Sequence, residues 1–185
     1  LLKLIKNQAR GKSDTETKSI SDTIAIFTEA SREEDIKSAI EFHGKICMEV
    51  IPRSIELGIP VRGATSYGEY EVDQNTFVGK AVDEAAAWHE STDWIGVHLT
   101  PSASFAFDIT GSTSWMEYEP PFKQRISWKT GCASWGREWL NSSRTVRDLT
   151  AAFRTLGPIT PDIAAKLTNS LKFVDASKAG AALER

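Results

Sequence analysis

The sequence is poor in cysteine and histidine, and neither residue type is clustered. Among its 185 residues are two cysteines, Cys47 and Cys132, which lie far apart and belong to no Cys-x-x-Cys or Cys/His group. We therefore expect two free thiols in a reducing cytoplasm. The three histidines, His43, His89 and His98, are scattered, and we expect structural roles for them.

Positive charge is also in short supply. Lys and Arg total 22 against 25 Asp and Glu, which gives a net charge of −3. Nothing in this balance would drive binding to nucleic acid or to an anionic membrane. No apolar run approaches the ~18–20 residues of a membrane span, and no signal peptide is evident. We expect a cytoplasmic protein that binds neither nucleic acid nor membrane.

The common enzyme signatures are missing as well: the sequence has no GxxxxGK[ST], GxGxxG, HExxH or GxSxG motif. The composition is 41% hydrophobic and 25% charged, as in ordinary globular proteins. A chain of this length can bury a sizeable core, so we expect one domain over 1–185.

The first half of the chain alternates between strand and helix patterns. Residues 7–17 are polar and predict a loop. Residues 19–27 alternate and predict one strand, or two short strands around a turn at Ser21–Asp22. Ser31 and Glu34 form a capping-box pattern, followed by apolar residues at helical spacing; this predicts a long helix to about Leu57, with Pro52 inside it.

The remaining patterns complete a mixed order. Residues 59–72 predict a strand pair, 80–89 a helix and 94–99 a buried strand. Residues 102–142 are interpreted as loop and short strands; a third helix follows near 146–153, and a fourth starts at Thr160–Pro161. The order βαββαβ followed by helices predicts an α+β or α/β fold with helices packed on a sheet.

Two local patterns could carry chemistry. Asp22 lies at the tip of the expected hairpin, where a carboxylate can hold a hard cation such as Mg²⁺ or can simply make the turn. Gly79 leads into a helix N-terminus, where backbone N–H groups can approach phosphate. The alternative is that the glycine only separates a strand from a helix, and that the alanines after it allow close helix packing.

Taken in order, three segments resemble the catalytic domain of class III nucleotidyl cyclases. That family has a Lys-Thr-Ile-Gly-Asp hairpin, an Arg-x-Gly-Ile-His-x-Gly strand and a Gly-x-x-Val-Asn-x-Ala-Ala-Arg helix start. The matching segments here are Lys18–Asp22, Arg62–Gly68 and Gly79–Ala87. The resemblance covers residues 18 to about 100. It implies a ferredoxin-like βαββαβ core, with helices on a mainly antiparallel sheet and further helices at the C-terminal end.

A narrower resemblance extends further along the chain. It is to the compact stand-alone cyclases of bacterial Pycsar anti-phage systems, which make cyclic UMP or cyclic CMP to activate a separate effector protein. The segments that carry it are 58–64, 77–81, 94–96, 121–123 and 166–174. The last of these, Lys-Leu-Thr-Asn-Ser-Leu-Lys-Phe-Val, is the segment that favours this group.

The resemblance implies a reaction and a metal site. The ribose 3′-hydroxyl of a nucleoside triphosphate attacks the α-phosphate and pyrophosphate leaves, with two Mg²⁺ or Mn²⁺ ions stabilising the attacking and leaving oxygens. Asp22 matches the second of the family's two metal-binding aspartates. The first belongs to an opening strand, which we expect upstream of residue 1.

Other positions match the family only in part. Lys18 and Thr76 fall where purine cyclases contact the base, and Tyr67 could line a base site or pack on a strand. The family's catalytic Asn and Arg fall on Asp83 and Ala87, so those roles are lost or moved. Arg62 is a spare cation that could bind substrate.

The resemblance also implies a head-to-tail homodimer with shared active sites, inactive as a single chain. The leading hypothesis is a pyrimidine cyclase that converts UTP or CTP in phage defence. The alternatives are an adenylate cyclase and a catalytically silent, nucleotide-binding regulatory dimer.

Overall fold

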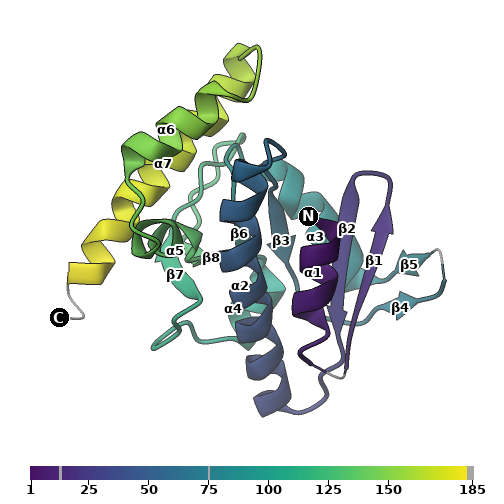
Figure 1. The fold of residues 1–185 in the computed structure, drawn as a ribbon. Helices are drawn as coiled ribbons and strands as arrows, with labels where there is room; N and C mark the ends of the chain where they lie inside the picture. The colour runs from purple at the N-terminus through teal and green to yellow at the C-terminus, as the bar shows by residue number, and fades with distance from the viewer. Residues whose placement is uncertain (13, 75, 183–185) are drawn as a thin grey trace.

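The computed structural model describes residues 1–12, 14–74 and 76–182, and these form a mixed α+β structure (Figure 1). Within the described residues the helices are α1 (Leu2–Ala9), α2 (Glu33–Glu56), α3 (Lys80–Ser91), α4 (Pro101–Ala106), α5 (Trp135–Asn141), α6 (Val146–Arg154) and α7 (Pro161–Ala182). The strands are β1 (Thr15–Ile20), β2 (Thr23–Thr28), β3 (Gly63–Thr65), β4 (Glu71–Val72), β5 (Phe77–Val78), β6 (Val97–Leu99), β7 (Trp115–Tyr118) and β8 (Thr130–Ala133).

The strands form one four-stranded sheet and two hairpins. The sheet has the order β3-β6-β8-β7, in which β3 and β6 are parallel and the other neighbours are antiparallel. The hairpins are β1–β2 and β4–β5. The expected α+β class and the prevalence of antiparallel pairing are therefore confirmed, whereas the cyclase-like core remains a prediction.

The first hairpin forms where two short strands were one of the predicted options. β1 and β2 pair from Thr15↔Thr28 to Ile20↔Thr23, so the turn falls on Ser21 and Asp22. Ser21 adopts a left-handed backbone with φ of 55°. The loop predicted over 7–17 is wrong at both ends, because α1 runs to Ala9 and β1 begins at Thr15; Ser13 within it lies outside the described residues. Ile5 and Ala9 are buried on α1, so packing stabilises this short helix.

The long helix α2 ends as predicted but starts differently. Leu57 and Gly58 end it, and Gly58 has a φ of +72°, typical of a helix C-terminus. The predicted capping box is wrong: the N-cap is Arg32, and its side chain makes no capping hydrogen bond. Three acidic residues, Glu33 to Asp35, occupy the first turn, where their negative charge stabilises the helix through its dipole.

The predicted strand pair over 59–72 is also wrong. β3 and β4 both lie in this stretch, but β3 pairs with β6 and β4 pairs with β5. Between them the chain passes through Gly68, whose φ is +152°. Because β3 pairs with β6, which lies more than 30 residues further along the chain, local alternation could not specify its partner.

The stretch 102–142 contains more regular structure than its sequence predicted. Besides β7 and β8 it forms α4 and α5, two short helices. Trp115 and Trp135 are almost completely buried in the main core together with Trp94 and Phe173. Phe173 lies on α7, so the C-terminal helix closes the core on the α5 side (Figure 1). No helix in the described ranges is long and apolar enough to cross a membrane.

Candidate functional site

The tip of the β1–β2 hairpin presents Asp22 to solvent. The turn consists of Ser21 and Asp22, and both residues are exposed. The left-handed φ of Ser21 is a conformation that glycine adopts without strain. Ser21 thus adopts a glycine-type conformation at the place where the motif that this segment resembles, Lys-Thr-Ile-Gly-Asp, has its glycine.

Lys18 lies on the side of the hairpin that β4–β5 covers. Side chains of paired residues share a face, so Lys18 shares its face with Phe27, because Glu16 pairs with Phe27 and Lys18 lies two residues on. The Phe27 ring lies 5.0 Å from that of Tyr70 and 5.5 Å from that of Phe77, measured between centroids. These contacts bring the β4–β5 hairpin, and with it Thr76, to the face that carries Lys18.

The Lys18 ammonium is engaged within its own strand. Its Nζ lies 3.3 Å from the Glu16 carboxylate, and both side chains are partly exposed. Exposed pairs of this kind contribute about 0–1 kcal/mol, so the contact can be exchanged for a ligand at small cost. Thr76 is exposed, and its carbonyl accepts the N–H of Asp73 at 2.8 Å.

The N-terminus of α3 is packed against backbone. Gly79 has a φ of +132°, and a Cβ there would lie 2.5 Å from the Glu69 carbonyl oxygen. The Ala81 N–H donates to the same carbonyl at 3.3 Å, and the Asp83 N–H donates to Gly79 at 3.0 Å. These contacts favour the packing explanation for Gly79 over a phosphate cradle. Asp83 itself is exposed on the first turn.

Arg62 and Tyr67 have roles elsewhere in the fold. An Nη1 of Arg62 donates to the Thr92 carbonyl at 3.2 Å, at the C-terminal end of α3, whereas Asp83 lies at the other end of that helix. The Tyr67 N–H donates to the Ser102 hydroxyl at 2.9 Å, and 41% of the residue is exposed. The structure thus groups Lys18 with the hairpin that carries Thr76, but it does not gather all the predicted residues.

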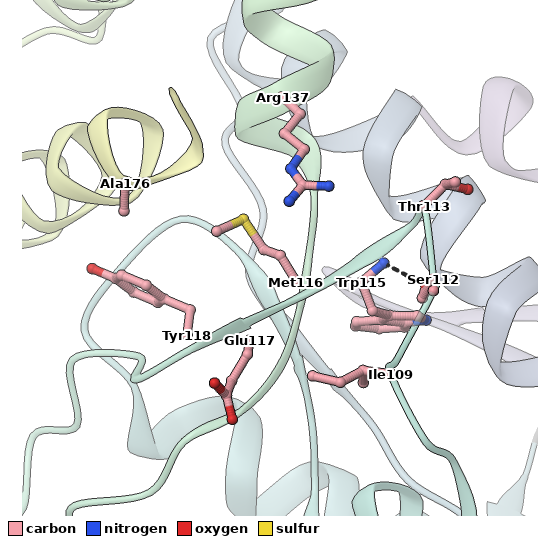
Figure 2. Close-up of a pocket in the computed structure, with 10 residues that line it drawn as sticks. Ile109, Ser112, Thr113, Trp115, Met116, Glu117, Tyr118, Arg137 and Ala176 are labelled. Atoms are coloured by element: carbon pink, nitrogen blue, oxygen red, sulfur yellow. Dashed lines mark hydrogen bonds between the residues drawn. The ribbon is translucent and has the colours of Figure 1, made fainter. Parts of the chain in front are cut away.

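Two cavities lie away from these residues. The larger, about 530 Å³, runs along β7 below Arg137 of α5 (Figure 2). The smaller, about 340 Å³, is lined by α2 residues and by Gly11 and Lys12. None of the predicted site residues lines either cavity. In the described part of the chain no three His, Cys, Asp or Glu side chains come together as a metal-binding group.

Sequence reasoning missed the polar groups around these cavities. Glu41 of α2 accepts hydrogen bonds from the Ser112 hydroxyl at 2.6 Å, the Thr113 hydroxyl at 3.4 Å and the Ser114 N–H at 3.3 Å. It therefore fixes the segment that leads into β7. No local pattern could have indicated this, because Glu41 and its partners are more than 70 residues apart in sequence.

Comparison of the chain with protein-family models, with curated proteins and with solved structures gave no match in any of the three.

Proposed function

We propose that this protein is a subunit of a nucleotide cyclase that acts on a pyrimidine nucleoside triphosphate, UTP or CTP. The observation that carries the proposal is the β1–β2 hairpin tip. There, Ser21 is left-handed at the glycine position of the cyclase hairpin motif, and Asp22 follows it, exposed. In the proposed site Asp22 binds Mg²⁺ or Mn²⁺, which would stabilise the attacking and leaving oxygens.

The arrangement of the strands agrees with this proposal. In Figure 1 β2 is the strand of the first hairpin that lies toward β3, one of the two edge strands of the four-stranded sheet. Val61, just before β3, packs in the same apolar cluster as Ile24 and Ile26 of β2. The proposal requires a further strand between β2 and β3, and this strand would carry the first metal-binding aspartate.

The substrate-binding part of the proposal rests on Lys18 and Thr76. Both lie on the side of the β1–β2 hairpin that faces β4–β5, where the Lys18 ammonium and the Thr76 hydroxyl could contact the base. This face stays partly open, since Ile20 is 44% exposed on it. We propose that a second subunit, arranged head to tail, completes the site there and supplies groups that replace the catalytic Asn and Arg.

A silent, nucleotide-binding dimer is the second candidate. Asp83 and Ala87 are the residues that favour it, because neither can neutralise phosphate charge. The adenylate cyclase alternative stays compatible with Lys18 and Thr76. In this proposal the cyclic nucleotide is a cytoplasmic second messenger, and it activates a separate effector protein.

The test is a product assay on the natural protein. It is supplied with Mn²⁺ and separately with ATP, GTP, CTP or UTP, and 3′,5′-cyclic monophosphates are sought by mass spectrometry. Cyclic UMP or cyclic CMP is the expected product, and cyclic AMP would indicate the adenylate cyclase instead. A well-folded dimer without any product would favour the silent module. The 185-residue chain is assayed in parallel to learn whether it suffices.

A variant pair tests the metal assignment. Asp22→Asn should lower product formation about a hundredfold or more, because a carboxylate that holds the metal contributes several kcal/mol to the transition state. Asp175→Asn is the matched control, since Asp175 is exposed on α7 and its carboxylate pairs with Lys178 of the same helix. Full activity in Asp22→Asn would overturn the metal site.

A further inference from the structure

The edge strand β7 borders the larger of the two cavities, which we call the β7 slot. β7 is the last strand of the sheet in the described residues, and all four of its residues line the 530 Å³ cavity. Arg137 of α5 and Ala176 of α7 lie on one side of the strand, and Ile109 lies on the other (Figure 2). A cavity that follows the edge of a strand is shaped for an extended chain rather than for a compact ligand.

The backbone of β7 offers hydrogen-bonding groups to this slot. Ser134 donates its N–H to the Ser114 carbonyl at 2.8 Å. In an antiparallel ladder, pairs that exchange hydrogen bonds alternate with pairs that do not, so Trp115 and Glu117 direct their peptide groups away from β8. The Trp115 N–H agrees with this direction, because it donates to the Ser112 hydroxyl at 3.0 Å. The Glu117 N–H and carbonyl remain on the outer edge.

The side chains beside the slot differ in charge between the two faces of β7. Figure 2 shows Met116 and Tyr118 directed to the same side as the Arg137 guanidinium, and Glu117 directed to the opposite side. Successive residues of an added strand also point to opposite faces. An acidic residue followed by a basic one would therefore place the acid near Arg137 and the base near Glu117.

We propose that the β7 edge is a docking site for an extended segment of a partner protein, which adds a strand to the sheet and carries adjacent acidic and basic residues. The slot is separate from Asp22 and Lys18, so this inference does not depend on the proposed cyclase activity. An unpaired edge strand is also a general hazard for aggregation, and a partner strand would cover it.

The test measures fluorescence polarisation with a labelled, capped heptapeptide, Thr-Val-Asp-Lys-Val-Thr-Val. The control peptide has two Pro residues in place of the Val-Thr that follows the Lys, so that in either register one of the lost N–H groups faces β7. We expect saturable binding of the first peptide below about 1 mM and none of the second. The amide of Glu117 should also become protected from hydrogen exchange when the peptide is present.

Two variants at the same position separate backbone pairing from charge. Glu117→Pro removes the outward N–H and should weaken binding at least about tenfold; the pairing with β8 is kept, since edge strands tolerate proline on their outer side. Glu117→Gln keeps the N–H and should weaken binding less than about fivefold. Circular dichroism checks that both variants fold, and the hydrogen-exchange result in the unaltered chain stands independently of them.

Three outcomes would overturn the proposal. One is the absence of peptide binding up to about 1 mM. Another is equal affinity in Glu117→Pro, which would place the peptide elsewhere. The third is a dimer, measured by light scattering, that Glu117→Pro dissociates, because a second copy of this chain would then occupy the slot.

Discussion

The N–H of Ile95 donates to the hydroxyl of Ser170 at 2.9 Å, across 75 residues of sequence. Both residues are buried, and the same hydroxyl donates to the Lys166 carbonyl at 2.7 Å. The neighbouring Asn169 donates to the Asp93 carbonyl at 2.9 Å. The segment Lys166–Val174 is thus an anchor that ties α7 to the chain entering β6.

The first prediction concerns this anchor. Ser170→Ala should lower the free energy of unfolding by about 1–3 kcal/mol, because the buried N–H of Ile95 loses its acceptor. Thr168→Ala is the control, since its exposed hydroxyl donates to the Ala164 carbonyl of its own helix; it should change stability by about 0.5 kcal/mol or less. Urea unfolding of both variants measures the difference. Equal losses in the two variants would contradict the anchoring role.

The second prediction concerns Gly79. Gly79→Ala should cost about 3 kcal/mol or more, because its Cβ would lie 2.5 Å from the Glu69 carbonyl oxygen and 2.7 Å from the Tyr70 Cα, and backbone cannot move aside cheaply. Gly111→Ala is the matched control. It also has a positive φ, of +77°, but nothing lies within 4 Å of the added Cβ, so only the strain of about 1–2 kcal/mol remains. Thermal and urea unfolding should separate the two, and similar losses would refute the close-contact argument.

Where glycine or proline marked a helix end and the apolar residues had helical spacing, the sequence predicted the helices correctly. α2 ends at Gly58, α6 is followed by Gly157 with a φ of +87°, and α7 begins at Pro161. α4 and α5 were missed, because helices of six or seven residues are stabilised by packing rather than by propensity. In α5 that packing buries Trp135 and Trp139, which local periodicity does not distinguish from a loop.

The candidate site, like the fold, could be predicted from the sequence only in part. The place of Asp22 at a hairpin tip follows from alternation and turn residues alone. The place of Arg62 does not, since its partner, the Thr92 carbonyl, lies 30 residues further along the chain. The β7 slot was not predicted at all, because Arg137, Ala176 and β7 meet only through the packing of α5 and α7 on the sheet.

The third prediction concerns the turn at Ser21. Its φ of 55° is strained for serine and free of strain for glycine. Ser21→Gly should therefore leave the fold unchanged and raise the free energy of unfolding by up to about 1 kcal/mol. The same change at Ser19, inside β1, should instead destabilise by about 1 kcal/mol. If Ser21→Gly loses stability like Ser19→Gly, the left-handed turn is wrong. In the proposed cyclase, Ser21→Gly should keep its activity.

The last prediction concerns pH and the buried ring of His98. His98 is fully buried, and within the described residues neither ring nitrogen has a hydrogen-bond partner. It packs edge-on against Trp88 and Phe122, with ring centroids 6.1 Å away in each case. Burial, with a smaller contribution from His89, lowers the pKa of His98 to about 4.

Because the pKa of His98 is lower in the folded chain than the ordinary value of about 6.5, the unfolded chain binds the proton more tightly. The contribution of His98 to stability is therefore complete above pH 6.5, falls as the pH drops toward 4 and levels off below that. The total loss is about 3 kcal/mol, at a slope of at most about 1.4 kcal/mol per pH unit.

His98→Leu removes this titration, so its stability should fall less than that of the unaltered chain between pH 7 and pH 4. The difference between the two isolates His98 from other titrating groups, among them His43, whose pKa is also lowered by burial and by Lys12. Urea unfolding at several pH values measures it. His89→Gln serves as the control, because it removes only the smaller cause of the lowered pKa of His98 and should keep most of the dependence. Parallel pH curves for His98→Leu and the unaltered chain would mean that the folded protein protonates His98 readily, which its burial among aromatic rings argues against.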